Sequence, residues 1–280
     1  MKCNSFYSFE IKNKENNYLN CYDSLDSNFI KYLEDSNYTA EEINEKIYEQ
    51  IIYYIKNFEI TEGKEKIIEG KDNYSFHLTT LQNEIDSLEG KNNDSNKFSK
   101  IDLGECENIL REKNHIDKND SLLILKYEKL NNEISRSNLQ YEIYELFNKK
   151  RLNLSVCKEV PINIYVPKVL SEQLHNLYNE LKDLGYDLFD INSHFYQDIC
   201  TPYKSTNGTD VILSDRINYY YNNEETQCQP NCQFSNYSFE SQYLKCECDI
   251  QNSEINFDNN NDIGAKSIYK SFYDVLKFSN

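Results

Sequence analysis

The sequence predicts an α+β fold: an antiparallel sheet covered by helices, followed by a small disulfide-rich C-terminal subdomain. Three observations predict it. Apolar and polar residues alternate over residues 139–145, 152–156 and 162–166, as expected of strands with one buried face. Segments with the apolar spacing of amphipathic helices lie on both sides of these strands, and four of the nine cysteines fall within residues 228–248.

The first helix is predicted over residues 40–57. Thr39 and Glu42 have the spacing of a capping box, in which each side chain accepts a hydrogen bond from the other residue's backbone N–H. Isoleucines recur at every fourth position of this segment, so they share one face of the helix. We expect this face, formed by Ile43, Ile47, Ile51 and Ile55, to pack against the core.

The middle of the chain is predicted to be rich in strands. Short strands are expected at 66–69 and 74–79, a short helix opens at 106–110, and an apolar run lies within a strand at 121–129. The short connection at 148–150 favours antiparallel neighbours in a meander. Such a sheet has one face in contact with water and one covered face.

The second clear helix is predicted over residues 171–184, where it could cover the sheet, and Gly185 is a natural C-terminal stop. A strand is expected at 210–213, and residues 252–264 read as a polar linker. The chain then divides into an N-terminal helical segment (1–65), an α+β core domain (66–222), a cysteine-rich subdomain (223–250), and a linker with a juxtamembrane-like tail (251–280).

The chain is acidic, with a formal net charge of −17 over 280 residues. Nucleic-acid binding needs a basic face that replaces phosphate counterions, and the sequence shows no basic cluster, so we expect no nucleic-acid partner. An anionic membrane surface is excluded as a partner for the same reason. No apolar run approaches the roughly 20 residues of a membrane span, and Met1 leads into polar sequence rather than a signal peptide. A secreted form would therefore have lost its leader, or the chain is a fragment.

The cysteines are expected to form disulfides, and their odd number leaves one unpaired. For the C-terminal four, two disulfides, a four-thiolate zinc site and free buried thiols are all possible. Structural zinc sites usually place two residues between neighbouring ligands, whereas the two gaps here hold three residues and one. Cys246 and Cys248 would face the same side of a strand and could meet two different partners, which favours disulfides. The nine residues are Cys3, Cys21, Cys106, Cys157, Cys200, Cys228, Cys232, Cys246 and Cys248.

Acceptor sequences for N-glycosylation are slightly more frequent than the composition predicts, which points weakly to secretion. The seven candidate asparagines are Asn37, Asn73, Asn93, Asn119, Asn153, Asn207 and Asn236.

A series of motifs resembles a known family. They occupy residues 185–192, 195–203, 207–210 and 213–216, with the C-terminal cysteine pattern and further matches at 102–106 and 140–144. These motifs are similar to those of an uncharacterised family of predicted surface proteins from AT-rich single-celled eukaryotes, ciliates among them. The resemblance covers about two thirds of the chain, from near Tyr74 to the end, and it implies a cysteine-containing ectodomain followed by membrane spans. The tail 268–280 then corresponds to the segment before the first span, and this chain is a truncated paralogue or an excised domain.

Few residues suggest catalysis. His194 and Asp198 lie close to Cys200 in sequence, but a nucleophilic thiol needs a base within hydrogen-bond reach and nothing in the spacing requires that contact. We therefore expect Cys200 to form a disulfide. The other histidines are dispersed, and a structural role is expected for His175, which lies beside the apolar stripe of a helix; they are His77, His115 and His175.

Oxygen-bearing side chains crowd the region before and after residue 200. Calcium prefers such ligands, but Asp and Asn also cap turns, and we expect turns here. The residues are Asp187, Asp190, Asn192, Asp198, Asp210 and Asp215, of which Asp187, Asp190, Asp210 and Asp215 are the candidate calcium ligands.

Arg216 is expected to form a buried charge pair with a nearby carboxylate and so to hold the turn that contains Gly208.

These observations predict an extracellular, cell-surface domain without enzymatic activity, which acts in adhesion, sensing or binding of an unknown protein or glycan. No cofactor is expected, and an exposed aromatic patch at 219–221 would support binding. Two alternatives stay open. An intracellular zinc-binding interaction module would hold zinc at the reduced C-terminal cysteines. A secreted hydrolase would carry two carboxylates in a pocket, one with a raised pKa.

Overall fold

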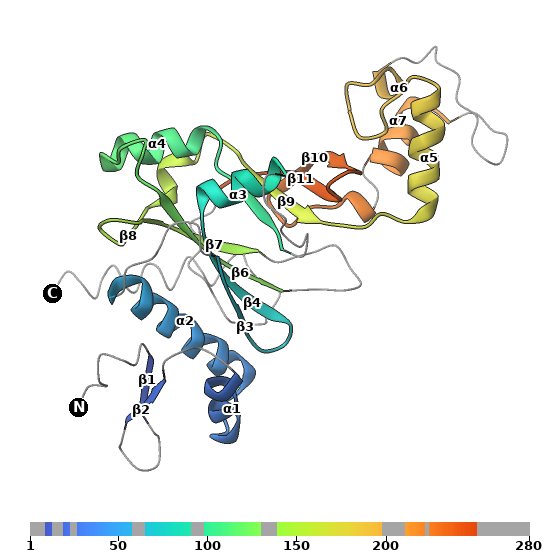
Figure 1. The fold of residues 1–280 in the computed structure, drawn as a ribbon. Coiled ribbons are helices and arrows are strands. Elements are labelled where there is room, and N and C mark those ends of the chain that lie inside the picture. The colour runs from blue at the N-terminus through green and yellow to red at the C-terminus, as the bar shows by residue number, and fades with distance from the viewer. Residues whose placement is uncertain are drawn as a thin grey trace.

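The computed structural model describes residues 9–12, 19–22, 27–57, 65–90, 98–129, 139–197, 211–221 and 224–250. Its architecture is α+β, as predicted: two antiparallel sheets form the centre and helices pack around them (Figure 1). A separate two-stranded hairpin, β1 (Phe9–Lys12) and β2 (Leu19–Tyr22), lies in the N-terminal segment near the first helices. No helix in these ranges is both long and apolar enough to cross a bilayer.

The central sheet has five strands in the order β3, β4, β6, β7, β8, and every neighbouring pair is antiparallel. Strands β6, β7 and β8 follow one another as the predicted meander. The five strands are β3 (Lys66–Glu69), β4 (Tyr74–Thr80), β6 (Leu122–Lys129), β7 (Gln140–Glu145) and β8 (Lys150–Arg151).

The prediction of one wet face is wrong for this sheet. The first seven residues of β6 are all buried, and so are the last six of β4. Elements from both ends of the chain cover the two faces, so alternation along a strand cannot mark a solvent side here. Polar residues on these strands are consequently enclosed, which creates the site described below.

Helices α1 (Ser27–Asp35) and α2 (Ala40–Asn57) cover one face of the central sheet. The predicted capping box is present: the Thr39 backbone N–H donates to Glu42 Oε2 at 2.9 Å, and the Glu42 N–H donates to Thr39 Oγ1 at 3.2 Å. The predicted isoleucine stripe is buried as well. It packs with sheet residues that include Phe76, Leu78, Leu123 and Leu125.

The second sheet has four strands in the order β10, β11, β9, β5, again all antiparallel. The predicted strand at 162–166 is β9 (Ile162–Pro167), but it pairs with β5 (Lys100–Asp102) and β11 (Tyr243–Cys248) rather than joining the meander. The cysteine-rich segment forms the hairpin of β10 (Cys232–Ser238) and β11, and this hairpin continues the sheet begun by β9. The predicted domain boundaries stay predictions.

The other face of the central sheet shares a core with this second sheet and with α3 (Leu81–Leu88) and α4 (Glu105–Asn114). The strand predicted at 152–156 is wrong. After a short coil, a 3-10 helix, η1 (Leu154–Cys157), begins there, because Asn153 Oδ1 accepts a hydrogen bond from the Ser155 N–H and so turns the chain.

A group of short helices lies at the far end of the four-stranded sheet (Figure 1). The predicted second helix is α5 (Glu172–Asp183), capped by Ser171, and Gly185 adopts a left-handed φ of 86° just after it. It packs beside α6 (His194–Gln197) and α7 (Leu213–Arg216), which runs into a π-helical turn, η2 (Ile217–Tyr221), with a 3-10 turn, η3 (Glu224–Thr226), following. The predicted strand at 210–213 is wrong in its described part, since Leu213 begins α7.

Candidate functional site

A buried polar cluster lies between the central sheet, α3 and the segment that leads into β5. The residues of β4 and β6 that face away from α2 include polar ones, and the register places His77 opposite Lys126 and Ser75 opposite Glu128. All four are at most 1% exposed. Burying charged groups is unfavourable unless each is paired and hydrogen-bonded, so this cluster is the most unusual feature of the described core.

Lys126 and Glu84 form the centre of the cluster. The Lys126 ammonium lies 2.9 and 3.0 Å from the two carboxylate oxygens of Glu84 and donates to the Ser99 carbonyl at 2.6 Å. Glu84 Oε2 also accepts the backbone N–H of Ile101 at 2.9 Å. The pair therefore joins α3, β6 and β5, and these added hydrogen bonds offset part of the desolvation cost.

Glu128 supplies a second buried carboxylate. Its two oxygens each lie 3.2 Å from the backbone nitrogen of Ser99. Burial raises the pKa of Glu128, while Lys126 and the contacts with Ser99 act in the opposite direction. This carboxyl consequently keeps its proton to a higher pH than a solvated glutamate does.

His77 is buried beside Glu65, which precedes β3. His77 Nε2 lies 2.5 Å from Glu65 Oε1, and His77 Nδ1 has no hydrogen-bond partner among the described residues. Burial lowers the pKa of His77, although the neighbouring Glu65 partly opposes this, so the imidazole is neutral at pH 7. The hydroxyls of Ser75 and Thr79, on the same face of β4, also have no hydrogen-bond partner within the described ranges.

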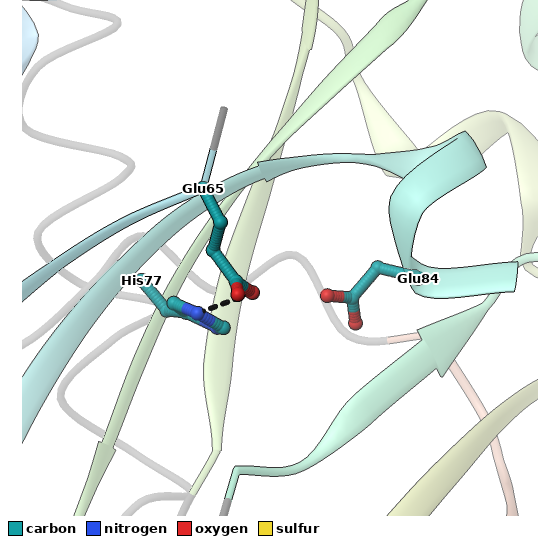
Figure 2. A group of neighbouring side chains, drawn as sticks. All are labelled: Glu65, His77 and Glu84. Carbon is teal, nitrogen blue, oxygen red and sulfur yellow. Dashed lines mark ion pairs between the residues drawn. The ribbon is translucent and has the colours of Figure 1, made fainter. Parts of the chain in front are cut away.

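Glu65, His77 and Glu84 converge on one point (Figure 2). One ligand atom from each lies within 4.8 Å of the others, although the residues come from the coil before β3, from β4 and from α3. Two carboxylates and a neutral imidazole are a donor set that divalent transition metals accept. The three side chains together could hold such an ion.

Another buried carboxylate, that of Glu142, lies on the opposite face of the sheet, and both of its oxygens have partners. Glu142 on β7 accepts hydrogen bonds from the Tyr48 hydroxyl at 3.1 Å and the Tyr144 hydroxyl at 2.6 Å. Arg151 Nη2 lies 3.2 Å from Glu142 Oε1. This junction ties α2 to the sheet and is structural, in contrast with His77, whose Nδ1 has no hydrogen-bond partner among the described residues.

Three disulfides are present among the described residues: Cys106–Cys157, Cys228–Cys246 and Cys232–Cys248. The prediction that Cys246 and Cys248 meet two different partners is confirmed. All four C-terminal sulfurs are used in these bonds, so in this form they cannot act as zinc thiolates. Cys3, Cys200 and the side chain of Cys21 lie outside the described part of the chain.

The candidate glycosylation sites can be examined at five positions, and the asparagine is exposed at every one. These are Asn37, Asn73, Asn119, Asn153 and Asn236. Asn37 and Asn73 have positive φ angles typical of turns. Asn93 and Asn207 lie outside the described residues.

The candidate calcium ligands are used in turns where they are described. Asp187 Oδ1 accepts the Phe189 N–H and Asp190 Oδ1 accepts the Asn192 N–H, both at 2.9 Å, which is the alternative role expected of them. Asp215 lies in α7, and Asp198 and Asp210 fall outside the described ranges. The calcium site stays a prediction, as does any contact of His194 with Cys200.

Arg216 is buried, at 2% exposure, as predicted. Its Nε donates to the Val211 carbonyl at 2.9 Å and its Nη1 to the Phe195 carbonyl at 3.1 Å, and the guanidinium lies over the Phe195 ring. Arg216 therefore ties α7 to α6 through backbone carbonyls. Gly208 and its turn lie outside the described residues, so the expected role of Arg216 there stays a prediction.

The tyrosines at 219–221 do not form one exposed patch. Tyr219 is 68% exposed, but Tyr221 packs against Tyr196 and Phe234, and its hydroxyl donates to the Phe234 carbonyl at 3.1 Å. The expected aromatic surface is thus reduced to one residue, because the π-helical turn directs the others toward the core.

The buried polar cluster was missed by sequence reasoning. The sequence marks His77 only as one of several dispersed histidines, and it does not single out Glu65, Glu84, Lys126 or Glu128. The available signal is the polar series Ser75, His77, Thr79 within one strand, together with charged residues that follow an apolar run in β6. Such residues normally indicate a solvent face.

Comparisons of the chain with protein-family models, with curated proteins and with solved structures find no match. The function must therefore be argued from the geometry of this molecule. Its three disulfides fit an extracellular, disulfide-rich domain, since such bonds form and persist in oxidising compartments.

Proposed function

We propose that this chain is the extracellular domain of a cell-surface protein and that it binds a protein or glycan ligand rather than catalysing a reaction. The observation that carries the proposal is the pairing of the C-terminal cysteines, Cys228 with Cys246 and Cys232 with Cys248. Each disulfide of a small region contributes about 2–5 kcal/mol where oxidation is maintained. The same cysteines would be reduced in the cytosol.

The exposed sequon asparagines support the same location. An oligosaccharide needs an accessible acceptor in a turn or loop, and each of the five described asparagines is exposed. A buried asparagine could not have been a glycosylation site. Glycans at these positions would surround the domain, a pattern that suits a protein exposed at a cell surface.

The charge of the chain narrows the class of ligand. A net charge of −17 repels acidic glycans and nucleic acids and attracts basic surfaces. We therefore expect a basic protein or a neutral glycan as ligand. Rates of association with a basic protein should fall as salt concentration rises, because screening weakens the attraction.

The buried carboxylates do not favour the hydrolase alternative. Glu84 and Glu128 are each 1% exposed and hold Lys126 and the Ser99 backbone. A general acid must come within hydrogen-bond reach of its substrate. In the described fold a glycan or peptide chain cannot approach these two groups.

The decisive test is the state of the cysteines in natively purified protein. The protein is purified from its native source, alkylated without reductant during cell lysis, and weighed as an intact mass after removal of glycans. We expect the six cysteines of the three pairs to stay unlabelled until a reductant is added. Labelling of the four C-terminal cysteines only after zinc is chelated would overturn the proposal and indicate the intracellular zinc module instead.

A further inference from the structure

We propose that Glu65, His77 and Glu84 form a binding site for one divalent transition-metal ion, with zinc the best match to the donor set. The site is separate from the cysteines, and it does not depend on the function proposed above. Two carboxylates and one imidazole provide three ligands, which leaves a fourth tetrahedral position for water.

The geometry of the three donors supports a shared ion. Their ligand atoms already lie within 4.8 Å of one another, so small rotations of long glutamate side chains bring them to metal–ligand distances of about 2 Å. Figure 2 shows both carboxylates directed toward the space beside the imidazole. The register of β4 with β6 and the position of α3 fix two of these side chains.

The hydrogen bonding of His77 points to an absent partner. Its ring is fully buried, its Nε2 has only the close contact with Glu65, and its Nδ1 has no hydrogen-bond partner in the described part of the chain. An unpaired polar group in a core costs about 1–3 kcal/mol. On the other face of the sheet, by contrast, both carboxylate oxygens of Glu142 have hydrogen-bond or ion-pair partners, as expected of a purely structural polar group. A metal ion bonded to one ring nitrogen would remove the anomaly at His77.

The charges of the cluster leave room for a cation. Glu65 and Glu84 bring two carboxylates, and the Lys126 ammonium is paired with Glu84. Lys126 does not block the site, because a carboxylate oxygen has two lone pairs. Among the described residues, Glu84 Oε1 accepts from Lys126 alone, whereas Oε2 also accepts from Ile101, so Oε1 can still bind a metal.

The donor set also selects the type of ion and its route. Calcium and magnesium prefer oxygen ligands only, whereas imidazole suits zinc and its neighbours in the first transition series.

The side chain of Glu65 is 24% exposed, while those of His77 and Glu84 are at most 1% exposed. An ion would consequently enter past Glu65, which is the ligand that can move into water and return.

The test is a zinc titration of the full, folded chain. Free thiols are first alkylated under native conditions, and the protein is stripped with a chelator. We expect elemental analysis to find one zinc per chain after dialysis, and zinc but not calcium to raise the melting temperature. Cobalt should give visible absorption bands of a nitrogen- and oxygen-bound ion, without a thiolate charge-transfer band.

Variants decide whether these residues are the ligands. Glu65→Gln removes one ligand at the partly exposed position and should weaken zinc binding at least tenfold, as His77→Gln should if it folds. His115→Asn and Glu89→Gln are matched controls at exposed positions, and both should bind as the wild type does. Zinc bound equally by Glu65→Gln, or less than one-tenth of a zinc per wild-type chain, would overturn the proposal.

Discussion

Cys232 and Cys248 face each other as Cα partners across the β10–β11 hairpin, and a disulfide joins them. A second disulfide, Cys228–Cys246, fastens the segment before β10 to the same strand β11. Since β11 pairs along its whole length with β9, both bonds anchor the C-terminal hairpin to the second sheet. The third, Cys106–Cys157, connects α4 to η1 over a sequence separation of 51 residues.

The number of residues between the two cysteines of a disulfide predicts how much that disulfide stabilises the fold. Replacing Cys232 and Cys248 by Ala opens a link over 16 residues and should lower the free energy of unfolding by about 3 kcal/mol. Replacing Cys106 and Cys157 should lower it by about 4 kcal/mol, because the longer loop restricts the unfolded chain more. Urea denaturation of the three proteins measures both values, and a larger loss for the shorter loop would contradict the entropic explanation.

The elements of the fold were largely predictable from local pattern, whereas their partners were not. The Thr39–Glu42 box and the isoleucine stripe identify α2, because caps and 3.6-residue spacing are local properties. Alternation also identifies β9 as a strand. It cannot reveal that Tyr165 lies between Lys245 and Lys100 in a second sheet, since those pairings join residues far apart in the sequence.

The candidate site was hidden for a related reason. Lys126 and Glu84 are 42 residues apart in the chain and meet only because α3 covers that face of β6. Read locally, Lys126 and Glu128 predict a solvent face, and the coverage that encloses them is a tertiary property. The strand predicted at 152–156 is wrong for a simpler reason. The side chain of Asn153 accepts a hydrogen bond from the Ser155 backbone N–H and so begins a 3-10 helix.

Glu142 gives a prediction about the α2 side of the sheet. Burial and the adjacent carboxylate raise the pKa of Tyr144, so its hydroxyl stays protonated and donates to Glu142. Glu142→Gln should therefore lower the free energy of unfolding by about 2–3 kcal/mol, and Tyr48→Phe by about 1.5 kcal/mol. The control is Arg151→Ala, whose partly exposed ion pair is worth less than about 1 kcal/mol. Equal losses in Glu142→Gln and Arg151→Ala would contradict the prediction and assign the whole loss to the ion pair, because the glutamine amide oxygen can still accept a hydroxyl.

Glu128 gives a prediction about pH. Its pKa in the folded protein lies above the ordinary value of 4.5, chiefly because of burial. Between those two values the folded state binds more protons than the unfolded state, so stability from this group falls as pH rises. The contribution is complete below pH 4.5 and is lost as pH passes the folded-state pKa.

The variant Glu128→Gln cannot titrate, and its amide oxygen can still accept from the Ser99 N–H. Relative to wild type, its free energy of unfolding should rise as pH increases from 4.5 toward neutrality. Urea denaturation at a series of pH values measures the difference between the two proteins. A difference that is independent of pH would mean that Glu128 titrates as a solvated carboxyl.

Asn153 carries two separable roles that can be tested together. Its side chain caps η1 by accepting the Ser155 N–H at 3.0 Å, and the same asparagine begins the sequon Asn153-Leu154-Ser155. Asn153→Ala removes both roles and should lower the free energy of unfolding by about 1 kcal/mol. Ser155→Ala removes the sequon but keeps the backbone donor of the cap, and Asn153→Asp keeps the acceptor while it removes the glycan site.

In protein secreted from eukaryotic cells, all three variants should lose the same glycan mass, and only Asn153→Ala should also lose the cap. An unchanged intact mass would show that Asn153 carries no glycan, and equal destabilisation of all three would assign the stability to the glycan rather than to the cap.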